Sequence, residues 1–138
     1  METKPYTRKV FYYETDMMGI VHHSNFIRWF EEARVDFMEQ FGYGYDESVA
    51  AGIDIVVLKV ACEFKSMIRF GDTVVIEMKI ASLEATRMAI TYHITDARTG
   101  ELRATGESGH CYYSRHKNRP VSLKKELPEL YDILMGFV

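Results

Sequence analysis

Cysteine, proline and long apolar runs are all scarce in this chain of 138 residues. The two cysteines, Cys62 and Cys111, are too few for a disulfide framework and lack the spacing of metal ligands. The longest apolar runs, such as Ile55–Leu58, are far too short to span a bilayer. Residues 1–5 lack the apolar segment of a secretory signal. We therefore expect a cytoplasmic protein without a membrane span.

An excess of positive charge is also missing. Seventeen Lys and Arg residues stand against twenty Asp and Glu residues, which gives a net charge of −3. Because nucleic-acid binding depends on neutralising phosphates, this balance argues against a nucleic-acid partner. A hydrophobic content of 47% with 27% charged residues is typical of globular proteins. No repeat, low-complexity tract or linker divides the sequence, so we expect one domain over residues 1–138.

Aromatic residues are abundant, and several of them predict one long amphipathic helix. Apolar side chains recur there at steps of three and four, with charged side chains on the opposite side. These apolar positions are Phe26, Phe30, Ala33, Phe37 and Phe41. Ser24 and Asn25 are candidate N-caps, and Gly42 is a candidate stop. At about 1.5 Å per residue, the helix would be about 25 Å long, enough to cross a sheet.

Strands predominate in the rest of the chain. Alternating apolar residues predict strands over residues 7–13, 53–65, 73–80, 88–95 and 101–113. Within the second of these, one face is predicted to carry Val56, Leu58, Val60, Cys62 and Phe64. Residues 46–51 and 128–135 are expected to form short helices. One long helix on a five-stranded antiparallel sheet is an α+β fold, and its uncovered sheet predicts edge-to-edge dimerisation.

The segment between the first strand and the long helix concentrates the polar chemistry. Asp16, Gly19, His22 and His23 all lie within it. Unpaired N–H groups at a helix start favour negative charge and can stabilise an oxyanion. Asp16 could act on a carbonyl as a general base or as a nucleophile. On spacing alone, Asp16 could equally cap a turn, with Gly19 supplying a positive φ angle.

One long motif spans this segment and continues into the predicted helix. Residues 13–26 read Tyr-Glu-Thr-Asp-Met-Met-Gly-Ile-Val-His-His-Ser-Asn-Phe, and Glu-Ala-Arg follows at 32–34. The motif resembles the signature of hotdog-fold acyl-CoA thioesterases, in the branch of 4-hydroxybenzoyl-CoA thioesterases and acyl-CoA thioester hydrolases. Residues 63–64 and 69–72 resemble that family's second and third strands and their turn. The resemblance spans residues 6–119 and implies a hotdog fold, in which a five-stranded antiparallel sheet wraps a long central helix.

The resemblance also implies an activity and assigns roles within it. It implies hydrolysis of an acyl-CoA thioester to a free acid and CoA. Asp16 aligns with the family's catalytic carboxylate, and His23 aligns with the position whose backbone N–H polarises the thioester carbonyl. Gly19 matches the glycine of the loop. His22 and Asn25 fall within the same motif and are expected to contact the substrate.

Two positions depart from the family pattern. His22 replaces the usual aromatic residue, and Phe26 replaces a tyrosine. Both changes alter the polarity of the pocket, so the acyl preference of relatives does not transfer to this chain. The resembled chemistry uses no metal and no cofactor, and neighbouring histidines such as His22 and His23 rarely bind one ion together. A homodimer is expected and, as in many relatives, a homotetramer.

A short basic run, residues 115–119, ends the last strand. Such runs are usually solvated loops. A CoA substrate needs cations near its phosphates, however, so Arg87, Arg115 and Lys117 are candidate phosphate contacts.

Weaker candidates lie on the helix and the strands. A related aryl-CoA branch uses a helix carboxylate, a part that Glu31 or Glu32 could play, although Glu31 fits a solvated face better. His93 and His110 are expected to be packed or solvent-facing. The two cysteines are expected to be small core residues without an adjacent base.

Two other functions remain open at this point. A hydratase or dehydratase on the same fold would use His23 with Asp16 on the carbons next to the thioester. A non-catalytic dimer could bind an acyl group without turnover, although a carboxylate facing a thioester has little use in a binder. Acyl length, and whether CoA or an acyl carrier protein carries the acyl group, are left undecided by the sequence.

Overall fold

The computed structural model describes residues 2–138 and assigns most of them to strands and helices. The strands are β1 (Tyr6–Lys9), β2 (Ile53–Phe64), β3 (Thr73–Leu83), β4 (Arg87–Asp96), β5 (Leu102–Ser114) and β6 (Arg119–Val121). The helices are α1 (Ser24–Gln40), α2 (Tyr45–Ala51), α3 (Leu123–Glu126) and α4 (Pro128–Met135), and η1 (Tyr12–Glu14) is a 3₁₀ turn.

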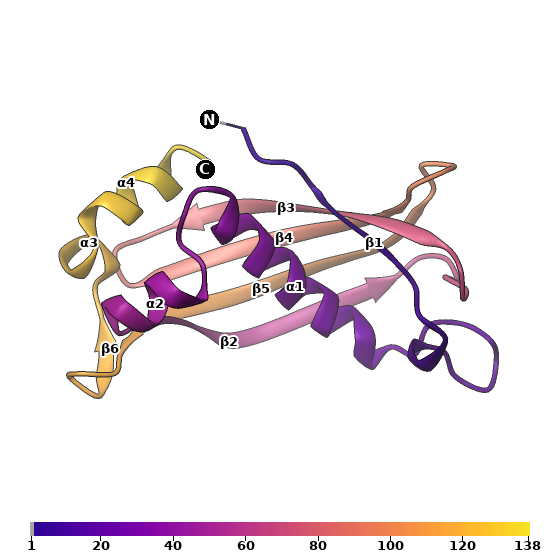
Figure 1. Cartoon of the computed structure of the whole chain (residues 1–138), viewed down its shortest axis with the longest axis horizontal. Coiled ribbons are helices and arrows are strands. Elements are labelled where there is room, and N and C mark those ends of the chain that lie inside the picture. The colour runs from indigo at the N-terminus through magenta and orange to yellow at the C-terminus, as the bar shows by residue number, and fades with distance from the viewer. Residues whose placement is uncertain (1) are drawn as a thin grey trace.

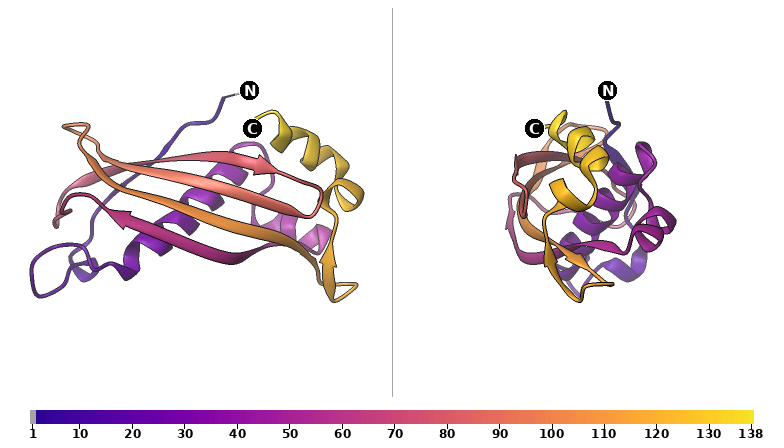
Figure 2. Two further views of the ribbon diagram at one scale, coloured as in Figure 1. Left: turned by 180° about the vertical axis from the view of Figure 1, so that it is seen from behind. Right: turned by 90° about the vertical axis from the view of Figure 1, so that its left-hand side faces the viewer.

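The strands form a single antiparallel sheet that curls around α1. Their order is β1-β3-β4-β5-β2, and short β6 pairs with the end of β5. α1 crosses the concave face of the sheet (Figure 1), and the end-on view in Figure 2 shows the sheet folded around it. This confirms the predicted α+β fold, with β6 as the strand that the prediction lacked.

Aromatic packing holds α1 against the sheet. Trp29 and Phe30 are fully buried. The Phe30 ring stacks on Tyr92 of β4 with ring centroids 4.2 Å apart. Gly106 of β5 makes this approach possible, because a Cβ at that position would lie only 2.3 Å from the Phe30 ring. Full burial of a large apolar side chain contributes about 1.5–3 kcal/mol, so this face fixes the position of the helix.

The predicted N-caps of α1 were wrong, whereas its start at Ser24 and its stop at Gly42 are confirmed. Ser24 and Asn25 are the first two helical residues, and the N-cap is His23, which makes no side-chain capping bond. Asn25 is buried, and its side chain bonds elsewhere, to the loop. At the other end, Gly42 has a φ of +87°, a conformation that suits glycine and stops the helix.

Two predicted strands also need correction. β1 is shorter than predicted, because the chain turns into η1 after Lys9. In β2, a bulge between Val57 and Lys59 interrupts the alternation. Val57 then pairs with His110 and Val60 with Ser108, so these two valines share the face toward α1. A bulge reverses the alternation of a strand. The predicted face is therefore right for the residues after the bulge, from Val60 onward, and wrong for Val56, which precedes it.

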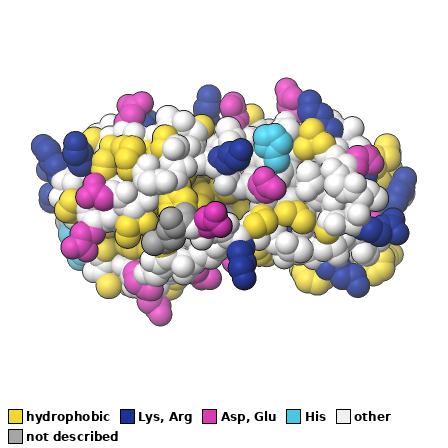
Figure 3. Space-filling view, turned by 90° about the horizontal axis from the view of Figure 1, so that it is seen from above, with side chains coloured by type: hydrophobic (Ala, Val, Ile, Leu, Met, Phe, Trp, Pro, Cys, Tyr) yellow, Lys and Arg dark blue, Asp and Glu magenta, His cyan; other side chains and the backbone are white. Residues whose placement is uncertain are grey.

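None of the helices in residues 2–138 combines the length and the apolarity that a membrane crossing needs. Charged side chains of both signs are interspersed on the face that Figure 3 shows.

Candidate functional site

The loop that enters α1 is folded around Asp16. Its carboxylate Oδ1 accepts the N–H of Met18 at 2.8 Å, and its carbonyl accepts the N–H of Gly19 at 3.0 Å. Gly19 has a φ of +78° and open space where a Cβ would lie, so conformation and not crowding requires glycine here. Asp16 thus caps a turn, as the simpler interpretation of the spacing predicts. Its other carboxylate oxygen, Oδ2, has no hydrogen-bond donor within residues 2–138.

The start of α1 offers a backbone donor beside this loop. The N–H of His23 meets no acceptor in the described part of the chain. The N–H of Ser24, by contrast, bonds to Nδ1 of His22 at 3.2 Å, and the N–H of Asn25 bonds to the His22 carbonyl at 3.0 Å. The His23 N–H lies at the positive end of a 17-residue helix, where an anion or an oxyanion is stabilised.

A buried carboxylate, Glu14, ties the loop to both β1 and α1. Arg8 donates from one guanidinium nitrogen to both carboxylate oxygens at 2.8 Å, and Trp29 donates from Nε1 at 2.9 Å. The N–H of Phe11 adds a further bond at 2.8 Å. Burial by itself would raise the pKa of Glu14, but the bonds from Arg8, Phe11 and Trp29 outweigh it and lower that pKa. Glu14 is therefore ionised, and its carboxylate connects the loop to β1 and α1.

The backbone of Glu14 also fixes the start of α1. Its carbonyl accepts the N–H of His22 and the side-chain amide of Asn25, both at 2.8 Å. Because Asp16 follows Glu14 by two residues, this anchor holds Asp16 and His23 in a fixed relation. The sequence analysis did not identify Glu14. Its carboxylate follows three aromatic residues and lies six residues after Arg8, a pattern that could have indicated a buried ion pair.

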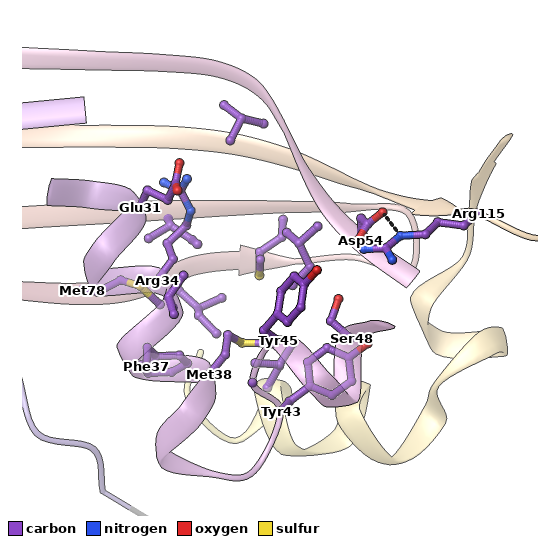
Figure 4. A pocket seen from close by; sticks show the side chains of 18 residues that line it. Glu31, Arg34, Phe37, Met38, Tyr43, Tyr45, Ser48, Asp54, Met78 and Arg115 are labelled. Carbon is purple, nitrogen blue, oxygen red and sulfur yellow. Dashed lines mark hydrogen bonds and ion pairs between the residues drawn. The ribbon is translucent and has the colours of Figure 1, made fainter. Parts of the chain in front are cut away.

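A cavity of about 370 Å³ lies near the other end of α1. Residues from α1, β2 and the segment around α2 form its walls, and Figure 4 shows the aromatic and methionine side chains that surround it. Apolar members of the lining include Met38, Met78, Ile80, Met88 and Ile90. Asp16 and His23 do not line it, and Glu31, the first α1 residue that does, is about 12 Å along the helix from His23. In Figure 1 the loop before α1 and the helix α2 lie at opposite ends of the molecule.

Of the three predicted phosphate contacts, only Arg115 lines the cavity. Its guanidinium makes two bonds to Asp54, at 2.6 and 2.8 Å, which lower the pKa of Asp54 (Figure 4). Lys117 lies farther along the basic run and pairs with Glu126 at 2.5 Å. Arg87 is exposed at the start of β4, opposite Cys111 of β5 and thus at the same end of the sheet as Arg115.

The weaker candidates are placed as follows. Glu32 accepts bonds from Arg8 at 3.0 Å and from the hydroxyl of Tyr6 at 2.9 Å, so it joins α1 to β1. Glu31 is exposed and lines the cavity. His93 is exposed and His110 is buried, as expected.

The cysteines and the two neighbouring histidines show no arrangement for other chemistry. Burial, with a smaller contribution from Glu63, raises the pKa of Cys62 to about 11, so its thiol is protonated at neutral pH. The rings of His22 and His23 stack with centroids 4.1 Å apart. Among the described residues, no three His, Cys, Asp or Glu side chains gather as metal ligands. Asp16 and His23 thus each keep one polar group without a hydrogen-bond partner among the described residues, namely a carboxylate oxygen and a backbone N–H.

Comparison with known proteins gives a consistent result. The model of the thioesterase-like superfamily matches residues 10–130. A protein of Aquifex aeolicus (strain VF5), whose name gives esterase as a provisional activity, is 35% identical over 125 residues, which are 91% of this chain and 94% of that protein. The acyl-CoA thioester hydrolase YbgC of Escherichia coli is 27% identical over 89 residues, 64% of this chain and 66% of that protein.

The fold is also that of a solved thioesterase. The DHNA-CoA thioesterase from Staphylococcus aureus superposes with a TM-score of 0.89 at 25% identity. The match covers 96% of this chain and 89% of that one. The similarity therefore extends over the sheet, α1 and the loop that carries Asp16.

Proposed function

Since the chain belongs to the thioesterase-like superfamily and is a thioester hydrolase, we propose that it cleaves acyl-CoA thioesters with Asp16 and the backbone N–H of His23. The observation that carries the proposal is that the loop before α1 holds a carboxylate with an unengaged oxygen and leads into a helix start with an unpaired N–H. Gly19 shapes the turn between them, and His22 and Asn25 fix the helix start and border the bound thioester.

In the proposed reaction Asp16 acts on the thioester carbonyl by one of two routes. It takes a proton from water, whose oxygen then attacks the carbonyl carbon, or it attacks that carbon itself, and water cleaves the resulting anhydride. In both routes the carbon–sulfur bond breaks and CoA leaves as a thiol. General-base catalysis of this kind contributes about 10²–10⁴-fold in rate.

The N–H of His23 is proposed to stabilise the oxyanion. Because it has no partner to give up, it can bond to the carbonyl oxygen without a competing loss. Removal of one such donor costs about 10²–10³-fold in other hydrolases. The role belongs to the backbone, so the His23 imidazole contributes less than the Asp16 carboxylate.

We propose that the protein is at least a homodimer, paired through β2. Among the described strands, β2 is at one edge of the sheet, since β5 is its only neighbour. It is 12 residues long and exposes several apolar side chains, among them Val57, Leu58 and Phe64. A long apolar edge of this kind is a surface for pairing with another chain. The exposed aromatic residues of the N-terminal segment, Phe11, Tyr12 and Tyr13, offer a second surface, on which two dimers could form the homotetramer.

A dimer of this kind would complete the site across two chains. In a two-fold antiparallel pairing, the end of one β2 lies beside the start of the other. The end of β2 is close to the start of α1, because the rings of Phe64 and Phe26 are 4.9 Å apart. The start of β2 lines the cavity through Ile55 and Val57. The Asp16 loop of one protomer would therefore face the cavity of its partner, which we assign to the acyl group.

The CoA phosphates are assigned to the basic end of the sheet. Arg115 at the cavity would exchange Asp54 for a phosphate, and Arg87 and Lys117 lie at the same end of the sheet. We place the reaction in the cytoplasm, since Cys62 and Cys111 are both free thiols.

Thiol release from a panel of acyl-CoA thioesters tests the proposal. Free CoA is the expected product, with and without a chelator in the buffer, since no step uses a metal. Hydration of an enoyl-CoA without thiol release would instead support the hydratase alternative. Acyl-CoA binding with neither reaction would support a non-catalytic binder.

A further inference from the structure

Arg34 is a half-buried cation without a carboxylate partner. Three arginines in residues 2–138 are half-buried, namely Arg8, Arg34 and Arg103. Arg8 pairs with Glu14 and Glu32, and Arg103 pairs with Asp96 at 3.0 Å. Arg34 forms no ion pair with any described residue, and its guanidinium makes one hydrogen bond, to the hydroxyl of Tyr92 at 3.0 Å.

The groups behind Arg34 are neutral and cannot balance its charge. Tyr92 bonds to Ser108 at 2.6 Å, and Ser108 bonds to Nε2 of His110 at 2.7 Å. Because a guanidinium only donates, Tyr92 accepts from Arg34 and donates to Ser108, which in turn donates to His110. The proton of neutral His110 is then on Nδ1, and this buried atom has no partner among the described residues. Burial, together with the nearby Arg34 charge, lowers the pKa of His110 to about 4, so this imidazole is uncharged at neutral pH.

Arg34 also lines the cavity near α2, whose walls are largely apolar. A guanidinium has five N–H donors, and four of those of Arg34 are unused by described residues. Desolvating a cation in apolar surroundings is costly unless an anion accompanies it. With a volume of about 370 Å³, the cavity is in the size range of small-molecule sites and can take a short acyl group.

We infer that the cavity binds acyl groups that end in a carboxylate, with Arg34 as the residue that pairs with that carboxylate. The substrate class is then the CoA monothioester of a short dicarboxylic acid. The inference rests on the proposed function, since the same cavity is assigned there to the acyl group. Glu31, three residues earlier on α1, lines the cavity as well and opposes an anion, so it limits the preference that Arg34 creates.

The test compares two thioesters of equal length, adipyl-CoA and hexanoyl-CoA, by thiol release. The wild-type protein is expected to favour adipyl-CoA in kcat/KM by about 10- to 100-fold, the range for hydrogen bonds to a charged group. Arg34→Met is expected to lower kcat/KM far more for adipyl-CoA than for hexanoyl-CoA and so to abolish this preference, and Glu31→Gln is expected to increase it. Arg34→Lys keeps the charge and is expected to keep part of the preference. Arg28→Met is the matched control, because Arg28 is exposed on the same helix and does not line the cavity.

Three outcomes separate the two proposals. Equal or better turnover of hexanoyl-CoA by the wild-type protein overturns the carboxylate inference and leaves the thioesterase proposal in place. Equal losses on both substrates in Arg34→Met also overturn it, because Arg34 would then only support the fold through Tyr92. Absence of thiol release from every acyl-CoA contradicts the proposed function itself. In that case, binding of adipyl-CoA by calorimetry, lost in Arg34→Met and retained in Arg28→Met, still supports the inference about the cavity.

Discussion

The indole N–H of Trp29 donates to the carboxylate of Glu14 at 2.9 Å, and this bond joins the middle of α1 to the loop that carries Asp16. Arg8 lies on the other side of the same carboxylate and also over the Trp29 ring, with its guanidinium carbon 4.8 Å from the ring centroid. Glu14, Trp29 and Arg8 thus form a closed arrangement in which each member contacts the other two. The loop that carries Asp16 is therefore anchored by these three residues as well as by the turn around Asp16 itself.

Replacement of Glu14 by Gln should therefore weaken both the fold and the reaction. Gln keeps the shape but loses the charge that Arg8 and Trp29 bind, so we expect a loss of about 2–3 kcal/mol in the free energy of unfolding. We expect kcat to fall because Asp16 and His23 lose their fixed relation, while KM changes little. Urea unfolding and thiol-release kinetics measure these effects, with Glu47→Gln on the exposed face of α2 as the control. Unchanged stability and kcat in Glu14→Gln would contradict the anchoring role.

Replacement of Asp16 by Asn separates turnover from binding. Asn keeps the size and can still accept the N–H of Met18, but it cannot take a proton or attack a carbonyl at a useful rate. We expect a rate loss of about 10²–10⁴-fold if Asp16 is a general base, with little change in acyl-CoA affinity. His23→Ala should lose less, because the backbone N–H remains. Near-normal thiol release by Asp16→Asn would rule out the proposed mechanism.

Most of the fold was predictable because it depends on local patterns. The step of three and four in α1 and the alternation in β3, β4 and β5 are both set by which side chains can be buried. The failures occurred where tertiary contacts override such patterns. The bulge after Val57 shifts one strand by one residue, and Asn25 has a capping side chain that bonds to Glu14 instead.

The candidate site was predictable in part. The motif indicates Asp16, Gly19 and His23 because their positions follow each other along the chain, and their roles stay a prediction. The anchor at Glu14 and the chain of bonds from Arg34 to His110 depend on contacts between residues far apart in the sequence. No local pattern indicates such contacts, so the cavity and its cation became visible only in the folded structure.

The stability of the protein should decrease as the pH falls through the range in which His110 gains a proton. The pKa of His110 is lowered from 6.5 to about 4, so between these values the unfolded chain binds the additional proton. The contribution of His110 to the free energy of unfolding is therefore complete above pH 6.5 and is lost toward pH 4. Between pH 7 and pH 5 this loss is about 2 kcal/mol. Urea unfolding at a series of pH values measures it, and His110→Gln should flatten the dependence over this range. An equally steep dependence in His110→Gln would assign it to other groups.

The proposed pairing of two copies through β2 can be tested by placing one charged side chain on that strand. Leu58 is 50% exposed on that strand, and a charge there would be buried without a partner if two copies pair. We expect Leu58→Glu to be a folded monomer of 16.0 kDa by light scattering, against two or four times that mass for the wild-type protein. Its thiol-release activity should be lost with the dimer. Ile133→Glu on α4 is the control, since Ile133 is a similarly exposed apolar residue away from β2, and a wild-type protein that is itself monomeric would contradict the pairing.

A mixture of two inactive variants tests whether each site is built from two chains. Asp16→Asn removes the carboxylate, and Met38→Trp fills the cavity of its own chain. In a mixed dimer, one site would combine both changes and the other would combine the intact Asp16 loop of one chain with the intact cavity of its partner. Random pairing makes half of the dimers mixed, so co-expression should restore about a quarter of the wild-type activity. If the loop and the cavity of the same chain formed a site, every site would carry one of the two changes, and the mixture would be no more active than the separate variants.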